Sequence, residues 1–176
     1  RHSTLPRRSA QSRWRRSSDL AAEFLARDSL TENCRYYPMS QQGALPDFHV
    51  AFAAEALTKI LRAEIQKTGL RKAVLGVSGG VDSALSLALA VNALGKENVL
   101  AVMMPYKSSN PDSLGDARKL CNKFGVATEV VEITAMADAY FSRDESITAT
   151  RRGNVMARLR MIVLYDLSAR DNALVI

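Results

Sequence analysis

The chain contains 176 residues, 47% of them hydrophobic and 24% charged, which is typical of one globular domain with a single sizeable core. No apolar run approaches the roughly 20 residues that a membrane span needs, so no membrane contact is expected. The two cysteines, Cys34 and Cys121, form no metal or redox motif. A reducing compartment, the cytoplasm, is therefore the expected location.

The net charge of +6 is concentrated near the N-terminus. Residues 1–18 contain six arginines, one histidine, five serines and no acidic residue, and residues 1–45 contain no lysine. Such a segment cannot bury enough apolar surface to offset its ordering entropy, so 1–45 is predicted to be a disordered extension or a cloning or gene-prediction artefact. An organelle presequence also fits the composition. A nucleic-acid tether is the third alternative, but Trp14 alone among arginines does not favour it.

The two ends of the chain give a further expectation. The sequence starts at Arg1 rather than at a methionine, and it stops within the apolar run 173–176. We expect both ends to be truncated. Because functional loops follow strand ends in α/β proteins, part of the site is expected beyond Ile176.

Apolar periodicity and glycine positions predict alternating helices and strands. Glycines 69, 95 and 125 mark helix ends, and 107–113 and 142–152 have loop composition. The predicted helices cover residues 49–68, 82–94, 113–124, 134–141 and 154–170, and the predicted strands cover 72–77, 98–104, 126–133 and 173–176.

This order predicts a three-layer α/β domain from about residue 46 to residue 176, with a parallel sheet and crossover helices. Ligands bind such sheets at the carboxyl ends of the strands. That edge comprises residues 78–83, residues 104–110, the loop after 133 and whatever follows Ile176.

The segment 76-GVSGGVDS-83 lies between the first predicted strand and the next helix. Glycines let the backbone approach an oxyanion closely, and the free amides of a helix start favour negative charge, so the segment predicts a phosphate-binding loop. The lysine of the usual nucleotide loop is absent. The alternative is an ordinary helix start capped by Ser78.

Asp82 is unusual in a phosphate loop because a carboxylate repels phosphate. A Mg²⁺ ion held by one carboxylate and by phosphate oxygens removes the conflict, so Asp82 is predicted to be a metal ligand. Ser83 can add a hydroxyl donor.

The helix in 153-GNVMARLRMIVLYD-166 has two distinct faces at 100° per residue. The predicted core face carries Val155, Leu159, Ile162 and Val163, and a second face carries Asn154, Arg158, Met161 and Tyr165. The second face is either a ligand-binding face or a solvated one. Asp166 and Arg170 are predicted to form a structural pair.

The string SGGVDS after an apolar strand resembles the pyrophosphate loop of the N-type ATP pyrophosphatases. That superfamily, with an adenine nucleotide alpha hydrolase-like fold, includes GMP synthetase, asparagine synthetase, tRNA-thiolating enzymes and NAD synthetase. Its members cleave ATP between the α and β phosphates, so the resemblance explains the missing lysine: a different bond is broken.

The pattern GNxxARxRM-x-x-LYD followed by NALV, with MMPY upstream, resembles the NAD synthetase family over residues 46–176. The resemblance implies that ATP is a co-substrate and that Asp82 binds Mg²⁺. It places Asn154 and Arg158 on deamido-NAD, and the family's remaining ATP and Mg²⁺ ligands just past residue 176. The ATP-binding residues that it implies are Gly76, Val77, Ser78, Gly79, Gly80, Val81, Asp82, Ser83 and Met104.

The implied reaction is the last step of NAD biosynthesis. The carboxylate of deamido-NAD attacks the α-phosphorus of ATP, and ammonia then displaces AMP from the adenylate. The family forms homodimers, and only about 45 residues precede the synthetase region, so the resemblance implies a homodimer of the ammonia-dependent type. A separate glutaminase is the alternative ammonia donor.

Two alternatives stay open from the sequence. The chain is either another ATP pyrophosphatase, such as a GMP synthetase or a tRNA-modifying enzyme, or a non-catalytic fragment that holds ATP but lacks half of the site.

Overall fold

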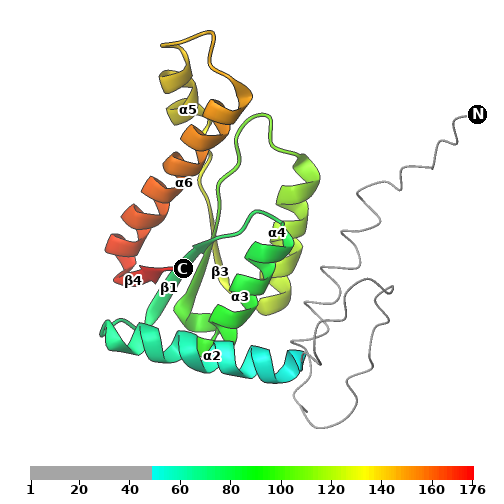
Figure 1. The fold of residues 1–176 in the computed structure, drawn as a ribbon, viewed down its shortest axis with the longest axis vertical. Coiled ribbons are helices and arrows are strands. Elements are labelled where there is room, and N and C mark those ends of the chain that lie inside the picture. The colour runs from blue at the N-terminus through cyan, green and yellow to red at the C-terminus, as the bar shows by residue number, and fades with distance from the viewer. Residues whose placement is uncertain (1–48) are drawn as a thin grey trace, which may run out of the picture.

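The computed structural model describes residues 49–176 (Figure 1). The interpretation of residues 1–45 and the domain boundary near residue 46 lie outside this range. The helices are α2 (Val50–Lys67), α3 (Val81–Leu94), the 3₁₀ helix η1 (Lys96–Asn98), α4 (Pro111–Phe124), α5 (Thr134–Phe141) and α6 (Ala149–Asp171). The strands are β1 (Lys72–Gly76), β2 (Val99–Met103), β3 (Ala127–Val130) and β4 (Ala173–Val175).

The four strands form one parallel sheet in the order β3-β2-β1-β4. In the register of the sheet, Leu75 lies opposite Ala101, Val74 opposite Val175, and Val102 opposite Glu129. The chain builds outward from β1 through β2 to β3 and then returns to place β4 on the other side of β1. The strand order therefore reverses between β1 and β4, and in such sheets ligands bind at the carboxyl ends of the strands beside that reversal.

Two cores, one on each face of the sheet, confirm the predicted three-layer architecture. Because side chains alternate along a strand, Leu75 and Met103 enter the core with α3 and α4, whereas Val74 and Val102 enter the core with α5 and α6. Figure 1 shows the same division, with α3 and α4 on one side and α5 and α6 on the other. Helix α2 packs against α3. None of the helices within residues 49–176 combines the length and apolar character that a bilayer-spanning segment requires.

Helix α6 differs from its prediction at its start. It begins five residues earlier than expected, at Ala149, because the Thr148 hydroxyl accepts a hydrogen bond from the Arg151 amide (3.4 Å) and caps the first turn. The Arg152 guanidinium lies 4.6 Å from the centre of the Phe141 ring, which holds this turn against α5. The last residues of the segment predicted as a loop are therefore helical.

Two predictions for side chains of α6 were wrong. Ile162, expected in the core, is 59% exposed, because the buried face of α6 centres on Val163 and Leu167. Successive residues lie about 100° apart around a helix, so Ile162 is turned away from the face that Val163 occupies. Arg170 does not pair with Asp166. Its guanidinium instead contacts Glu129 of β3 and the adjacent Asp171.

Candidate functional site

The loop between β1 and α3 has a backbone shape that requires glycine at position 79. Gly79 has a φ of +82°, a region that L side chains rarely adopt. A Cβ atom at this position would lie 2.3 Å from the carbonyl oxygen of Ser113, in the first turn of α4. The loop is therefore held closely between α3 and α4, with its backbone open to the carboxyl edge of the sheet.

Two serine hydroxyls stabilise the loop from within. Ser83 Oγ donates to the Gly80 carbonyl oxygen (2.8 Å) and accepts from the Ser78 amide (3.2 Å). Since that proton is used, Ser78 Oγ is the donor in the 3.1 Å contact between the two hydroxyls, and it accepts from the Gly80 amide (3.3 Å). These bonds close residues 78–83 into a compact turn.

The start of α3 leaves amides free for an anion. Gly80 is the N-cap residue, and the first intrahelical bond runs from the Ala84 amide to the Gly80 carbonyl oxygen (3.0 Å). The amides of Val81, Asp82 and Ser83 therefore have no intrahelical acceptor. The alternative in which Ser78 caps the helix is wrong, since Gly80 occupies that position. Backbone amides, glycines and the helix dipole together suit a phosphate group.

Asp82 lies in the first turn of α3, and its side chain is exposed. No group of three or more histidine, cysteine, aspartate or glutamate side chains comes together within residues 49–176 to make a metal site by itself. Mg²⁺ is commonly bound by only one or two carboxylates, with substrate phosphates and water as the other ligands. A single exposed carboxylate at the lip of a phosphate loop fits that donor set.

Met104 connects the loop to the neighbouring strand. It directly follows β2 and is buried. Its Cε atom lies 3.0 Å from the position that a Cβ on Gly76 would occupy, and its carbonyl oxygen accepts a hydrogen bond from Arg160 Nε of α6 (3.0 Å). Gly76 and Met104, both predicted to be site residues, are therefore brought together.

The segment after Met104 is held to α5 by hydrogen bonds to Asp138. Asp138 accepts hydrogen bonds from the Lys107 amine (2.6 Å) and from the Tyr106 hydroxyl (2.7 Å). The bond from Lys107, followed by the one from Tyr106, holds the pKa of Asp138 below its usual range, and Asp138 raises the pKa of Lys107. The Lys107 amide also donates to Thr134 Oγ1 (2.9 Å).

Three residues near this edge were missed from the sequence: Tyr106, Asp138 and Arg160. Tyr106 and Asp138 are 32 positions apart, and nothing local to either signals the contact. A signal did exist for Arg160, because it lies three and four positions before Val163 and Leu164 on the helical repeat that faces the sheet.

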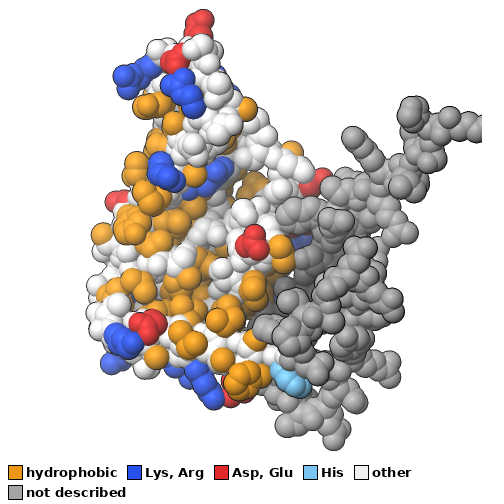
Figure 2. All heavy atoms as spheres, in the orientation of Figure 1, with side chains coloured by type: hydrophobic (Ala, Val, Ile, Leu, Met, Phe, Trp, Pro, Cys, Tyr) orange, Lys and Arg blue, Asp and Glu red, His pale blue; other side chains and the backbone are white. Residues whose placement is uncertain are grey.

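Asn154 and Arg158 occupy the outward face of α6, opposite the face that packs on the sheet, and both are exposed. Within residues 49–176, neither side chain forms a hydrogen bond or an ion pair with the loop at 76–83. Their outward neighbours are apolar: Met161 is 45% exposed, Ile162 is 59% exposed and Tyr165 is 61% exposed. Figure 2 shows apolar side chains gathered over α6 in this view. The face therefore combines a guanidinium and an amide with apolar surface.

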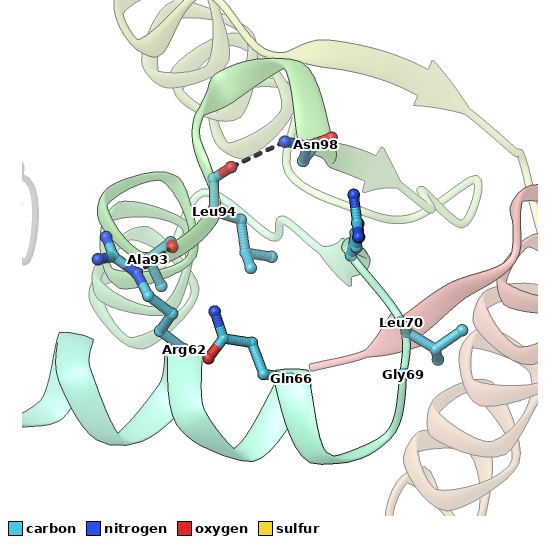
Figure 3. Close-up of a pocket in the computed structure, with 8 residues that line it drawn as sticks. Arg62, Gln66, Gly69, Leu70, Ala93, Leu94 and Asn98 are labelled. Carbon is cyan, nitrogen blue, oxygen red and sulfur yellow. Dashed lines mark hydrogen bonds between the residues drawn. The ribbon is translucent and has the colours of Figure 1, made fainter.

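A separate cavity of about 480 Å³ lies near the C-terminal ends of α2 and α3 (Figure 3). Arg62 is one of its cationic residues, and it donates to the carbonyl oxygens of Ala93 (2.7 Å) and Asn92 (2.9 Å). The guanidinium thus satisfies the end of α3, and Asn98 does the same for Leu94 (2.9 Å). Arg62 thus joins α2 to α3, and Asn98 joins η1 to the end of α3, so the role of both residues is structural.

The comparisons with known proteins agree with one another. The sequence profile of the NAD synthase family matches residues 53–176. An NH3-dependent NAD(+) synthetase of Fusobacterium nucleatum is 50% identical over 130 residues, which cover 74% of this chain and 50% of that protein. The chain thus spans about half the length of this relative.

Solved structures give the same result. An NH3-dependent NAD synthetase of Campylobacter jejuni, in complex with the nitrate ion, has a TM-score of 0.65 and 39% identity, covering 69% of this chain and 53% of that one. A glutamine-dependent NAD+ synthetase of Acinetobacter baumannii, in complex with ADP, has a TM-score of 0.69 and 32% identity, and the match covers 78% of this chain and 27% of that one.

Proposed function

Because this chain belongs to the NAD synthase family, we propose that the protein catalyses the ATP-dependent amidation of deamido-NAD with ammonia, giving NAD, AMP and pyrophosphate. The observation that carries the proposal is the loop at 76–83, whose free amides and glycine backbone suit the phosphates of ATP at the reversal of strand order. The names of the matched relatives support ammonia as the nitrogen donor.

In the proposed first step, a carboxylate oxygen of deamido-NAD attacks the α-phosphorus of ATP, and pyrophosphate leaves. The amides of Val81, Asp82 and Ser83 bind the departing phosphates, while Met104 borders the adenosine. Asp82 would hold Mg²⁺, which supplies charge neutralisation on the phosphates when bound. No covalent nucleophile is required, because the protein acts by positioning the substrates and stabilising charge.

In the second step, ammonia attacks the activated carbonyl carbon, and AMP leaves with the oxygen that came from the carboxylate. Asn154 and Arg158 are proposed to bind the anionic dinucleotide, for which a guanidinium is suited. The ammonia is either free or delivered by a separate glutaminase.

The outward position of Arg158 supports a homodimer. Met161, Ile162 and Tyr165 surround it with exposed apolar surface, which a second copy of the chain would cover. In such a dimer the substrate site lies beside the interface, and Arg158 faces it. A cytoplasmic location is also proposed, in keeping with the free and buried Cys121. The presequence interpretation of residues 1–18 has no support from the comparisons.

The proposal is tested with the protein expressed from its complete reading frame, supplied with ATP, Mg²⁺, deamido-NAD and ammonium. Formation of NAD with equal amounts of AMP and pyrophosphate is expected. Pyrophosphate release with xanthosine monophosphate or tRNA, but not with deamido-NAD, would instead assign the protein to another ATP pyrophosphatase.

A further inference from the structure

Arg160 of α6 lies against the end of β2, where it contacts the Met104 backbone. The carbonyls of β2 that point toward β1 alternate along the strand, and the Val102 carbonyl oxygen accepts a hydrogen bond from the Val77 amide (2.8 Å). The next carbonyl on that side belongs to Met104, and its next donor in the ladder would be the Gly79 amide. Gly79 has left the strand, with a φ of +82°, to form the phosphate loop.

Arg160 Nε takes the place of that missing donor, at 3.0 Å from the Met104 oxygen. The bond joins two residues that are 56 positions apart in the chain. The same face of α6 continues one turn later with Leu164, whose Cδ1 atom lies 3.6 Å from where a Cβ on Gly76 would be. Helix α6 therefore meets both strands at the point where the loop begins.

We propose that Arg160 is a positioning residue for ATP, because its bond to Met104 fixes the backbone beside the loop where the nucleotide lies. This inference rests on the proposed function, and it assigns Arg160 a role distinct from that of Arg158. Two residues apart on a helix, the two side chains point about 200° apart, so Arg160 faces the sheet while Arg158 faces outward.

The environment of Arg160 agrees with a structural contact of this kind. The side chain is partly buried, and burial lowers the pKa of its guanidinium. Among the salt bridges found within residues 49–176 none involves Arg160, so its polar contact in that range is to the Met104 backbone. A hydrogen bond from a charged donor is stronger than a neutral one, and removing the donor would leave the carbonyl free to move.

The test compares Arg160→Met with the wild type of the complete protein in steady-state NAD formation. The variant keeps the apolar stem but loses the donor. KM for ATP is expected to rise about tenfold, with KM for deamido-NAD within about twofold of the wild type. Arg160→Lys, which retains a cationic donor, is expected to recover most of the loss. Arg170→Met is the matched control, on the same helix but in a surface ion pair, and its KM values are expected to stay unchanged.

Several results would overturn the inference while leaving the proposed function intact. An unchanged KM for ATP in Arg160→Met would show that the bond does not position the nucleotide. A rise confined to deamido-NAD would make Arg160 a contact for the dinucleotide. If Arg160→Met does not fold, Arg160→Gln replaces it in the test. The shorter side chain of glutamine is polar but does not reach the Met104 carbonyl oxygen, so the same rise in KM for ATP is expected. Failure of the wild type to make NAD would instead contradict the proposed function.

Discussion

At the scale of single residues, the proposed chemistry depends on a few positions of the loop at 76–83. Its residues have different roles. Gly79 permits the turn, Ser78 and Ser83 stabilise it by hydrogen bonds, and Asp82 is exposed in the first turn of α3. Because these roles are separate, single substitutions should separate folding from ligand binding.

Asp82→Asn tests the metal assignment. Because the side chain is exposed, the thermal unfolding midpoint should stay near that of the wild type. Mg²⁺-dependent NAD formation should fall by about 100-fold or more, since the amide is a poor ligand for the cation. The exposed Glu64→Gln on α2 is the control for loss of one acidic charge. Turnover of Asp82→Asn near the wild-type rate would remove the assignment.

Gly79→Ala tests the requirement for glycine in the loop. A methyl group would meet the Ser113 carbonyl oxygen at 2.3 Å with the backbone at φ +82°, so a loss of about 1–3 kcal/mol of stability and weakened ATP binding are expected. Gly115→Ala in α4 is the matched control. It meets no atom within 4 Å and should stabilise the helix by about 0.5–1 kcal/mol. Chemical denaturation and ATP titration measure both, and equal behaviour of the two variants would contradict the account.

At the scale of elements, helix α6 is proposed to serve two functions with opposite faces. Its inner face contributes Val163, Leu167 and Arg160 to the contact with the sheet, and its outer face presents Asn154 and Arg158.

Arg158→Ala should therefore raise KM for deamido-NAD about tenfold or more while changing KM for ATP little. Arg151→Ala, on the same helix in an exposed pair with Asp144, is the control. Equal effects on both KM values would make Arg158 structural.

The cluster of Asp138 with Lys107 and Tyr106 joins α5 to the segment after β2, and its contribution should depend on pH. Because the folded-state pKa of Asp138 is lowered, its contribution is present above the unfolded value, about 4, and is lost as the pH falls through the folded value. Asp138→Asn should thus lower the unfolding midpoint at pH 7, and the difference from the wild type should shrink below about pH 4. Asp116→Asn, which breaks only an exposed pair with Lys119, is the control. A difference that persists at low pH would contradict the role of the charge.

The apolar period and the glycine positions predicted each α-helix from α2 to α6 and each strand, because those signals are local, whereas the short 3₁₀ helix η1 was not predicted. The face of α6 was misjudged at Ile162, since a long amphipathic helix offers several apolar stripes and only packing on the sheet selects one. The contacts that join Met104 to Arg160, and Tyr106 to Asp138, depend on the strand order and on the alternation of carbonyls. No local pattern contains that information.

At the scale of the whole molecule, the reversal of strand order at β1 places β4 beside the strand that leads into the loop. The outward face of α6 lies on the exterior and is apolar around Arg158. Both features fit a site that is completed at an interface between two copies.

Ile162→Glu tests this arrangement. A buried carboxylate without a partner is costly, so the variant should shift from dimer to monomer in sedimentation velocity and lose NAD formation. Met136→Glu on α5, which is 37% exposed, is the control and should leave the dimer intact. A wild-type protein that sediments as a monomer at full activity would rule the dimer out.

The most direct test of the central claim, amidation through an adenylate, follows the carboxylate oxygen. Deamido-NAD labelled with oxygen-18 at both oxygens of the nicotinate carboxylate is converted with ATP and ammonium. The masses of the products are then measured by mass spectrometry. Attack on the α-phosphorus predicts that AMP retains one labelled oxygen, with pyrophosphate unlabelled. Unlabelled AMP, or ADP and phosphate in place of AMP and pyrophosphate, would contradict the account, because neither outcome passes through a bond between that carboxylate and the α-phosphorus.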